Sequence, residues 1–395
     1  MKKKKLIILF VVFVVAASAF AYFYKQNQDF AKNISIEKTL EEQIKNIEMP
    51  TKGEIEMEIG VKGEVEGEKI DFKMKSAGKT QQDLRNKKLD FDLKNKISAN
   101  IDTEEFGKKE IKDLEVDFGM KLVDDSMYFK VSTDLDKLMK IFEDDKQIQS
   151  GIQFFGMMIN NKDFFIDLKK LESLDPQGVN NIDQIYSLDE QKQMLAAVKN
   201  SYLKHKPFKL NFLNQTDSVN GSKAGKFEVE FDTEKLIDFY VEVVKENIKK
   251  NPELNSEDVM KEIDRMSLVL KENKDILENN IKGNMYLWIT QDNKIVKSKV
   301  NLEFDFIKLG NELDKKMGGN KTVQGNLDIK LNITATENKA NTIEIEKPEK
   351  AVDVMTMMGG FMMGGMQPQE PVAQPVPTRL IPEKVEKTAP SVSPA

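Results

Sequence analysis

The sequence has no cysteine and a single histidine, His205. Without thiols there are no disulfides, thiolate nucleophiles or cysteine-based metal sites, and no lipidated cysteine of the kind that anchors bacterial lipoproteins. One histidine excludes a multi-histidine metal site and a histidine pair for catalysis. His205 falls at the expected end of a helix, where a cation complements the helix dipole. The glycines form neither a phosphate loop nor a dinucleotide-binding motif. We therefore expect no catalytic residue, no metal and no cofactor.

Basic charge is scarce outside the N-terminus. The 395 residues include 60 basic and 66 acidic side chains, which gives a formal charge of −6. The first 25 residues hold five lysines and no acidic residue, so the remainder has 55 basic against 66 acidic residues, a charge of −11. Nucleic-acid binding needs a concentrated basic face. We therefore exclude nucleic acid as a partner.

The N-terminus combines a basic start with a long apolar run. Lys2–Lys5 precede nineteen uncharged residues, Leu6–Tyr24. At about 1.5 Å per residue such a helix reaches roughly 28 Å, enough to cross a bilayer core. Residues 1–25 are therefore expected to be a signal anchor, which makes the protein a single-pass membrane protein with its C-terminal domain outside the cytoplasm. Cleavage after Ala19 or Ala21, as in a signal peptide, would instead release a secreted protein.

Apolar and charged residues alternate along much of the chain, which is typical of strands with one face in water. From Ile55 to Val61 the apolar residues fall on one parity, while Glu54, Glu56 and Glu58 fall on the other. Similar runs, joined by polar turns, cover residues 70–74, 89–101, 114–131, 208–231, 285–306 and 327–333. The sequence thus predicts a large antiparallel sheet, whose apolar face must be covered by something.

Segments with helical spacing interrupt these strands. Ile36, Leu40 and Ile44 recur at that spacing ahead of Pro50, so residues 26–50 are predicted to be a spacer with a short helix. Further amphipathic helices are expected at 134–160, 187–204, 233–250 and 256–278. The predicted fold class is α+β, with a large curved antiparallel sheet packed against amphipathic helices over residues 51–350.

The alternation stops near residue 350. Seven of the twelve prolines lie in Gln367–Ala395, so residues 351–395 are predicted to be a disordered tail. Within this tail, Met355–Met366 has six methionines in twelve residues. A low-complexity linker, a flexible apolar contact and Cu(I) binding by thioethers are three open interpretations. The linker is preferred, because no histidine or cysteine supports a copper site.

Two alternative hypotheses for the function depend on how much of the apolar face of the sheet the helices cover. Partial cover leaves an apolar hollow for a lipid or other hydrophobic ligand, whereas full cover makes the protein an envelope or surface structural protein that contacts other envelope proteins. Partial cover is the preferred hypothesis. The candidate ligand-binding residues are the large apolar side chains of the strands: Met57, Ile59, Phe72, Met74, Phe91, Phe118, Phe227, Phe231, Trp288 and Phe304.

Three features support a resemblance to a known family. They are the long alternating strands, a strand that enters a helix at Phe227–Leu236, and a hairpin from Met285–Thr290 back through Ile295–Val300. In this layout, residues 50–345 resemble the LolA/LppX-like group of exported bacterial lipoproteins and lipoprotein carriers. The resemblance implies an open half-barrel around helices, a location in the bacterial envelope and a lipid or lipoprotein ligand. The chain departs from that group in having no lipidated cysteine, so attachment would depend on Leu6–Tyr24.

Overall fold

The computed structural model describes residues 34–104, 107–170, 188–249, 256–316, 318–319 and 322–357. The chain divides into two compact units, Met1–Asp353 and Val354–Ala395, and the fold below is that of the first unit. In the described parts of the chain, no helix is both long enough and apolar enough to cross a bilayer. The expected membrane segment, Leu6–Tyr24, and nearly all of the expected tail lie outside the described residues.

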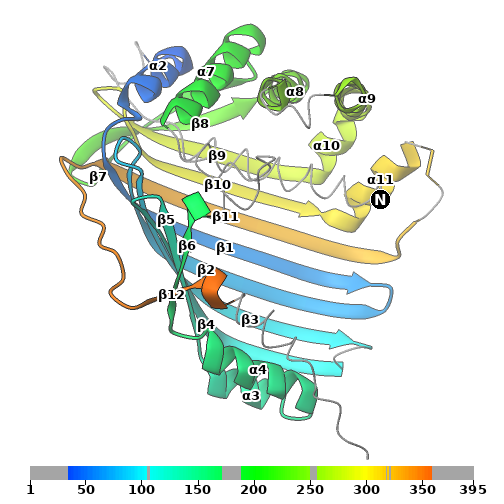
Figure 1. Cartoon of the computed structure of the whole chain (residues 1–395). Helices are drawn as coiled ribbons and strands as arrows, with labels where there is room; N and C mark the ends of the chain where they lie inside the picture. The colour runs from blue at the N-terminus through cyan, green and yellow to red at the C-terminus, as the bar shows by residue number, and fades with distance from the viewer. Residues whose placement is uncertain are drawn as a thin grey trace, which may run out of the picture. The chain divides into compact units, whose positions relative to one another are not determined.

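Over the described ranges of the chain, twelve strands form one sheet in the order β12–β6–β5–β4–β3–β2–β1–β11–β10–β9–β8–β7, which does not close (Figure 1). All neighbouring strands are antiparallel except β12 and β6, which are parallel. The strands are β1 (Thr51–Val65), β2 (Glu68–Asp83), β3 (Lys88–Thr103), β4 (Gly107–Val123), β5 (Ser126–Thr133), β6 (Asp163–Asp167), β7 (Phe208–Val219), β8 (Ser222–Phe231), β9 (Ile281–Thr290), β10 (Ile295–Asp305), β11 (Gly325–Lys339) and β12 (Ala351–Asp353).

Tight turns of left-handed backbone set the register of the long hairpins. Glu66 and Gly67 join β1 to β2 with φ of 55° and 94°, and Asn220 and Gly221 join β7 to β8 with φ of 52° and 78°. Two consecutive positive φ angles match the twist of antiparallel strands, and Asn and Gly tolerate this conformation best. The predicted antiparallel sheet is therefore confirmed, together with its α+β class.

Two glycines allow neighbouring strands to approach closely. A Cβ atom on Gly63 would lie 2.0 Å from the backbone oxygen of Asn326, and one on Gly78 would lie 2.3 Å from that of Asp92. Both glycines share a face with the apolar residues of their strands, because Gly63 pairs with Ile70 and Gly78 pairs with Ile55. Glycine at such positions permits a sheet to bend toward that face.

The helices form two groups (Figure 1). The larger group lies over the β7–β11 part of the sheet, and the smaller group lies between β5 and β6 in the chain. The larger group comprises α2 (Ile36–Asn46), α7 (Leu188–His205), α8 (Thr233–Lys249), α9 (Glu257–Glu272), α10 (Lys274–Asn280) and α11 (Phe306–Lys316). The smaller group comprises α3 (Leu135–Ile141) and α4 (Lys146–Met158).

The structure differs from the sequence predictions at four places. The expected helix at 256–278 divides into α9 and α10 at Asn273. The expected helix at 134–160 is two helices, because the Asp145 side chain accepts hydrogen bonds from two backbone amides and starts α4. The run ending in Phe306 is predicted as strand, but α11 begins at that residue, and Phe306 packs against the buried apolar residues of this helix. The sheet also continues past residue 350, since Ala351–Asp353 pairs with β6.

Candidate functional site

One face of the sheet carries the alternating apolar residues of nearly every strand. Residues directly opposite each other in antiparallel strands point to the same side. The register of the strands therefore links eight residues in one row that runs from β8 to β4: Phe227, Leu287, Ser298, Ala335, Ile55, Gly78, Leu93 and Phe118. We call this side the inner face, and the side that carries Glu58 and Lys73 the outer face.

The inner face of β7–β11 is filled by helices. Ile36 and Leu40 of α2, Tyr202 of α7 and Phe239 of α8 belong to one buried cluster with Leu287 and other residues of β7–β10. The cavity that remains between α2 and β7–β9 has a volume of only about 10 Å³, at the lower limit for a single water molecule. Farther along the strands, α10 and α11 cover Phe304 and Ile329. The space left between α2 and β7–β9 is therefore too small for a ligand.

The same face of β1–β4 is only half covered. Within the described residues, β1 and β2 contain no buried apolar side chain, whereas on the same face β3 buries Ala99 and β4 buries Leu114 and Leu122. By contrast, the single strand β9 buries Met285, Leu287 and Ile289. The half-buried apolar side chains of this face include Ile55, Met57, Ile59, Val61, Ile70, Phe72, Met74, Phe91, Leu93, Ile97, Val116, Phe118 and Met120, which we call the half-covered surface.

The ten predicted ligand-binding residues fall into four groups. Six of them belong to the half-covered surface: Met57, Ile59, Phe72, Met74, Phe91 and Phe118. Phe227 and Phe304 share the inner face but are 2% and 4% exposed beneath helices, so the protein itself occupies their surroundings. Phe231 lies at the end of β8 and is 43% exposed. Trp288 lies on the outer face, because it pairs with Lys226 while its neighbour Leu287 pairs with Phe227.

Trp288 belongs to a compact cluster on the outer face. Its indole Nε1 donates a hydrogen bond of 2.5 Å to the Asp217 carboxylate, and this bond holds the pKa of Asp217 below its usual value. The ammonium groups of Lys226 and Lys297 lie 5.3 and 5.0 Å from the indole ring. Trp288 is 6% exposed among Ala224 and Val296. With its ring and its N–H both in contact with protein groups, Trp288 is a packing residue rather than a ligand-stacking surface.

A polar pair interrupts the half-covered surface, and the sequence analysis did not identify it. The Ser76 hydroxyl donates to the Asn95 side-chain oxygen at 2.7 Å, and the Asn95 amide donates to the carbonyl of Val116 at 2.7 Å. Ser76 and Asn95 stand opposite each other and in line with Met57. The alternation along the strands could have revealed this pair, because Ser76 and Asn95 both occupy positions where their strands otherwise carry apolar residues. Each bond satisfies a polar group that an apolar ligand would otherwise leave unpaired.

The outer face has a polar hollow of about 480 Å³ over β3–β6. The charged residues that line it include Asp92, Lys94, Asp117, Lys130 and Asp163, and Pro348 lines it as well. Burial raises the pKa of Asp90 in the same hollow. Among the described residues, no three acidic or histidine side chains are placed to hold a metal ion. The mixed charge gives this hollow no preference for a cation or an anion.

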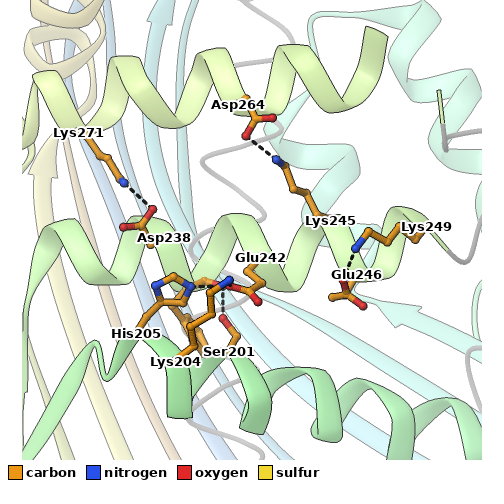
Figure 2. A network of polar contacts seen from close by, with 11 residues as sticks. Ser201, Lys204, His205, Asp238, Glu242, Lys245, Glu246, Lys249, Asp264 and Lys271 are labelled. Atoms are coloured by element: carbon orange, nitrogen blue, oxygen red, sulfur yellow. Dashed lines mark hydrogen bonds and ion pairs between the residues drawn. The ribbon is translucent and has the colours of Figure 1, made fainter. Parts of the chain in front are cut away.

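His205 belongs to an ionic network between helices (Figure 2). Its Nε2 lies 2.5 Å from Glu242 of α8, which also accepts from Lys204 at 2.8 Å. Burial opposes ionisation of Glu242, but the hydrogen bonds from Lys204 and His205 outweigh burial and lower the pKa of this carboxyl. Ser201 lies nearby, yet its hydroxyl donates to the backbone carbonyl of Phe239 at 2.9 Å and is 1% exposed. Ser201 is therefore not an accessible nucleophile, and the network instead joins α7 to α8.

The same network continues from α8 to α9 (Figure 2). Asp238 accepts from Lys271 at 2.5 Å, and Lys245 pairs with Asp264. These contacts hold α9 against α8, while apolar residues of α7 and α8 pack on β7–β10. Fold and surface together define an α+β protein with one open sheet, filled on one half of its inner face and half covered on the other. No protein-family model matches the chain, and no curated protein matches it in sequence.

Proposed function

We propose that the protein is a membrane-tethered extracytoplasmic protein of half-barrel form that binds a lipid or another apolar molecule on its half-covered surface, without catalysis. A single observation carries this proposal: the apolar residues of one inner face are buried by helices along β7–β10, whereas along β1–β4 most of them, with the exception of Ala99, Leu114 and Leu122, are only half buried. Contiguous apolar surface that a soluble domain leaves accessible marks a site for a ligand or partner.

The layout of this surface favours an elongated ligand. Ile59 of β1, Met74 of β2 and Ile97 of β3 follow one another across the sheet, and Val61 and Phe72 form a parallel row beside them. Successive strands lie about 4.8 Å apart, so three or four of them offer a width of roughly 15 Å. Acyl chains match such a surface because they need apolar contact and few directional hydrogen bonds.

The test uses the full chain reconstituted in phosphatidylcholine vesicles that contain a phosphatidylcholine with a photoactivatable diazirine in its acyl chain. After illumination, mass spectrometry maps the lipid adducts. We expect adducts on inner-face residues of β1–β4 and none on their outer-face neighbours. Adducts divided equally between the two faces, or absent from the sheet, would contradict lipid binding.

Neighbouring residues of β2 supply matched variants. Met74 lies on the half-covered surface, whereas Lys75 lies on the outer face and is exposed. We expect Met74→Glu to reduce adducts on β1–β4 at least tenfold, because a buried charge has no partner there, and Lys75→Glu to leave them unchanged. A filled core without ligand, the alternative function, predicts no adducts in any variant and a large loss of stability in Met74→Glu.

A further inference from the structure

The α3–α4 hairpin contains a stretch without charge that the proposed ligand surface does not include. Residues 147–161 have no charged side chain, although 32% of the chain is charged. They contain Ile148, Ile152, Phe155 and Met158, which are half buried. Neither α3 nor α4 has a single buried residue. The hairpin is therefore apolar in composition without belonging to the core.

One side of α4 presents this apolar character to solvent. Met157 is 68% exposed and Phe154 is 50% exposed, the two highest values among the large hydrophobic residues of the hairpin. Gln147, Ser150 and Gly151 are exposed as well, and their spacing of three or four residues places them on the same side. These five residues form a stripe that is apolar at the C-terminal end of the helix and polar but uncharged at the N-terminal end.

The hairpin holds this stripe in a fixed position. Asn160, just after α4, accepts a hydrogen bond from the Thr133 backbone amide at 2.8 Å and donates to the Thr133 carbonyl at 3.2 Å. These bonds pin the end of α4 to the end of β5. At Gly156 a Cβ atom would lie 2.5 Å from Leu135 of α3, so the two helices pack tightly. Exposed apolar side chains on a rigid support are suited to a partner surface rather than to a flexible linker.

We propose that this stripe of α4 docks on the surface of a lipid bilayer. An amphipathic helix at a membrane interface needs apolar side chains on one side and no charge to desolvate there. Exposed Lys146 lies beside the stripe, where its ammonium group can reach lipid phosphates, and exposed Lys162 follows the stripe with its ammonium donating to the Met157 carbonyl. The chain length also favours a membrane, because the ten residues from Lys25 to Ile34 span at most roughly 35 Å. The proposal rests on the expected membrane tether at Leu6–Tyr24 and not on ligand binding by the sheet.

The absence of native cysteine allows a clean test with single-cysteine variants of the full chain in phosphatidylcholine vesicles. Gln153→Cys places an environment-sensitive dye on exposed α4, and Leu268→Cys places it on α9, where Leu268 is 60% exposed. With doxyl-labelled lipid present, we expect at least threefold stronger quenching at position 153 than at 268. Because the stripe itself is uncharged, high salt should not abolish this difference.

Two further variants decide the interpretation. Adding Met157→Ser and Phe154→Ser to Gln153→Cys should remove the excess quenching while the circular dichroism spectrum stays unchanged, because both side chains are exposed. Equal quenching at positions 153 and 268 would overturn the proposal. So would disulfide-linked dimers through Gln153→Cys without quenching, which would assign the stripe to a second copy of the chain. Quenching at position 153 together with an absence of lipid adducts on β1–β4 would support bilayer docking by α4 and contradict ligand binding by the sheet.

Discussion

The half-covered surface predicts that two leucines in the same row of the sheet differ in their contribution to stability. Leu287 of β9 and Leu93 of β3 both point to the inner face, and the register places them in one row. Leu287 is 3% exposed in the cluster under α2, α7 and α8, whereas Leu93 is half buried. Replacing each by alanine removes the same atoms from two different environments.

The expected magnitudes follow from burial. Leu287→Ala removes a fully enclosed side chain and leaves a cavity, which costs about 3 kcal/mol of unfolding free energy within a usual range of 2–5. Leu93→Ala loses most of a leucine transfer free energy but leaves no enclosed cavity, so its cost is about 1.5–2 kcal/mol. The measured difference should therefore be about 1 kcal/mol, or roughly fivefold in the unfolding equilibrium constant.

Urea unfolding of the full chain in mild detergent measures both values. Trp288 is the only tryptophan and is 6% exposed, so its fluorescence reports on β8–β10, while far-ultraviolet circular dichroism reports on the whole sheet. The slope of free energy against urea should be unchanged, so that shifts in midpoint reflect stability alone. If Leu93→Ala costs as much as Leu287→Ala, the inner face of β1–β4 is filled and our interpretation of the surface fails.

Two further predictions concern the bend of the sheet and the helix layer. Gly63→Ala should lower the free energy of unfolding by about 1–3 kcal/mol, because its Cβ would lie 2.0 Å from a backbone oxygen. Gly60→Ala should be tolerated in the same urea assay, because the atom nearest to its Cβ would lie 3.8 Å away. Glu242 has a pKa lowered from 4.5 in the folded state, so its contribution to stability is complete above that value and is lost as pH falls through the folded pKa. Glu242→Gln should therefore melt below wild type at pH 7, with the gap narrowing as acidity increases, and a constant gap would argue against this ionic role.

Much of the strand architecture could be predicted from the sequence. The parity of Ile55, Met57 and Ile59 against Glu54 and Glu58 is a local property, because successive residues of a strand point to opposite faces. The turn at Asn220 and the helix ending before Pro50 are also local, since backbone preferences within a few residues decide them. The same reasoning failed at Phe306, where an apolar residue suits either a strand or a helix and packing against Leu309 and Leu313 decides.

The sequence by itself thus determined that the chain builds a wide antiparallel sheet with one charged face and one apolar face. Only the tertiary structure decided which strands the helices cover. Phe227 and Phe118 look equivalent in the sequence, yet α2, α7 and α8 bury the first, and the second remains half buried. The physical reason is that alternation specifies a face, whereas cover depends on the order of strands in the sheet and on where each helix returns to it. That order places β1–β4 between the two helical groups, with their apolar side chains only partly removed from water.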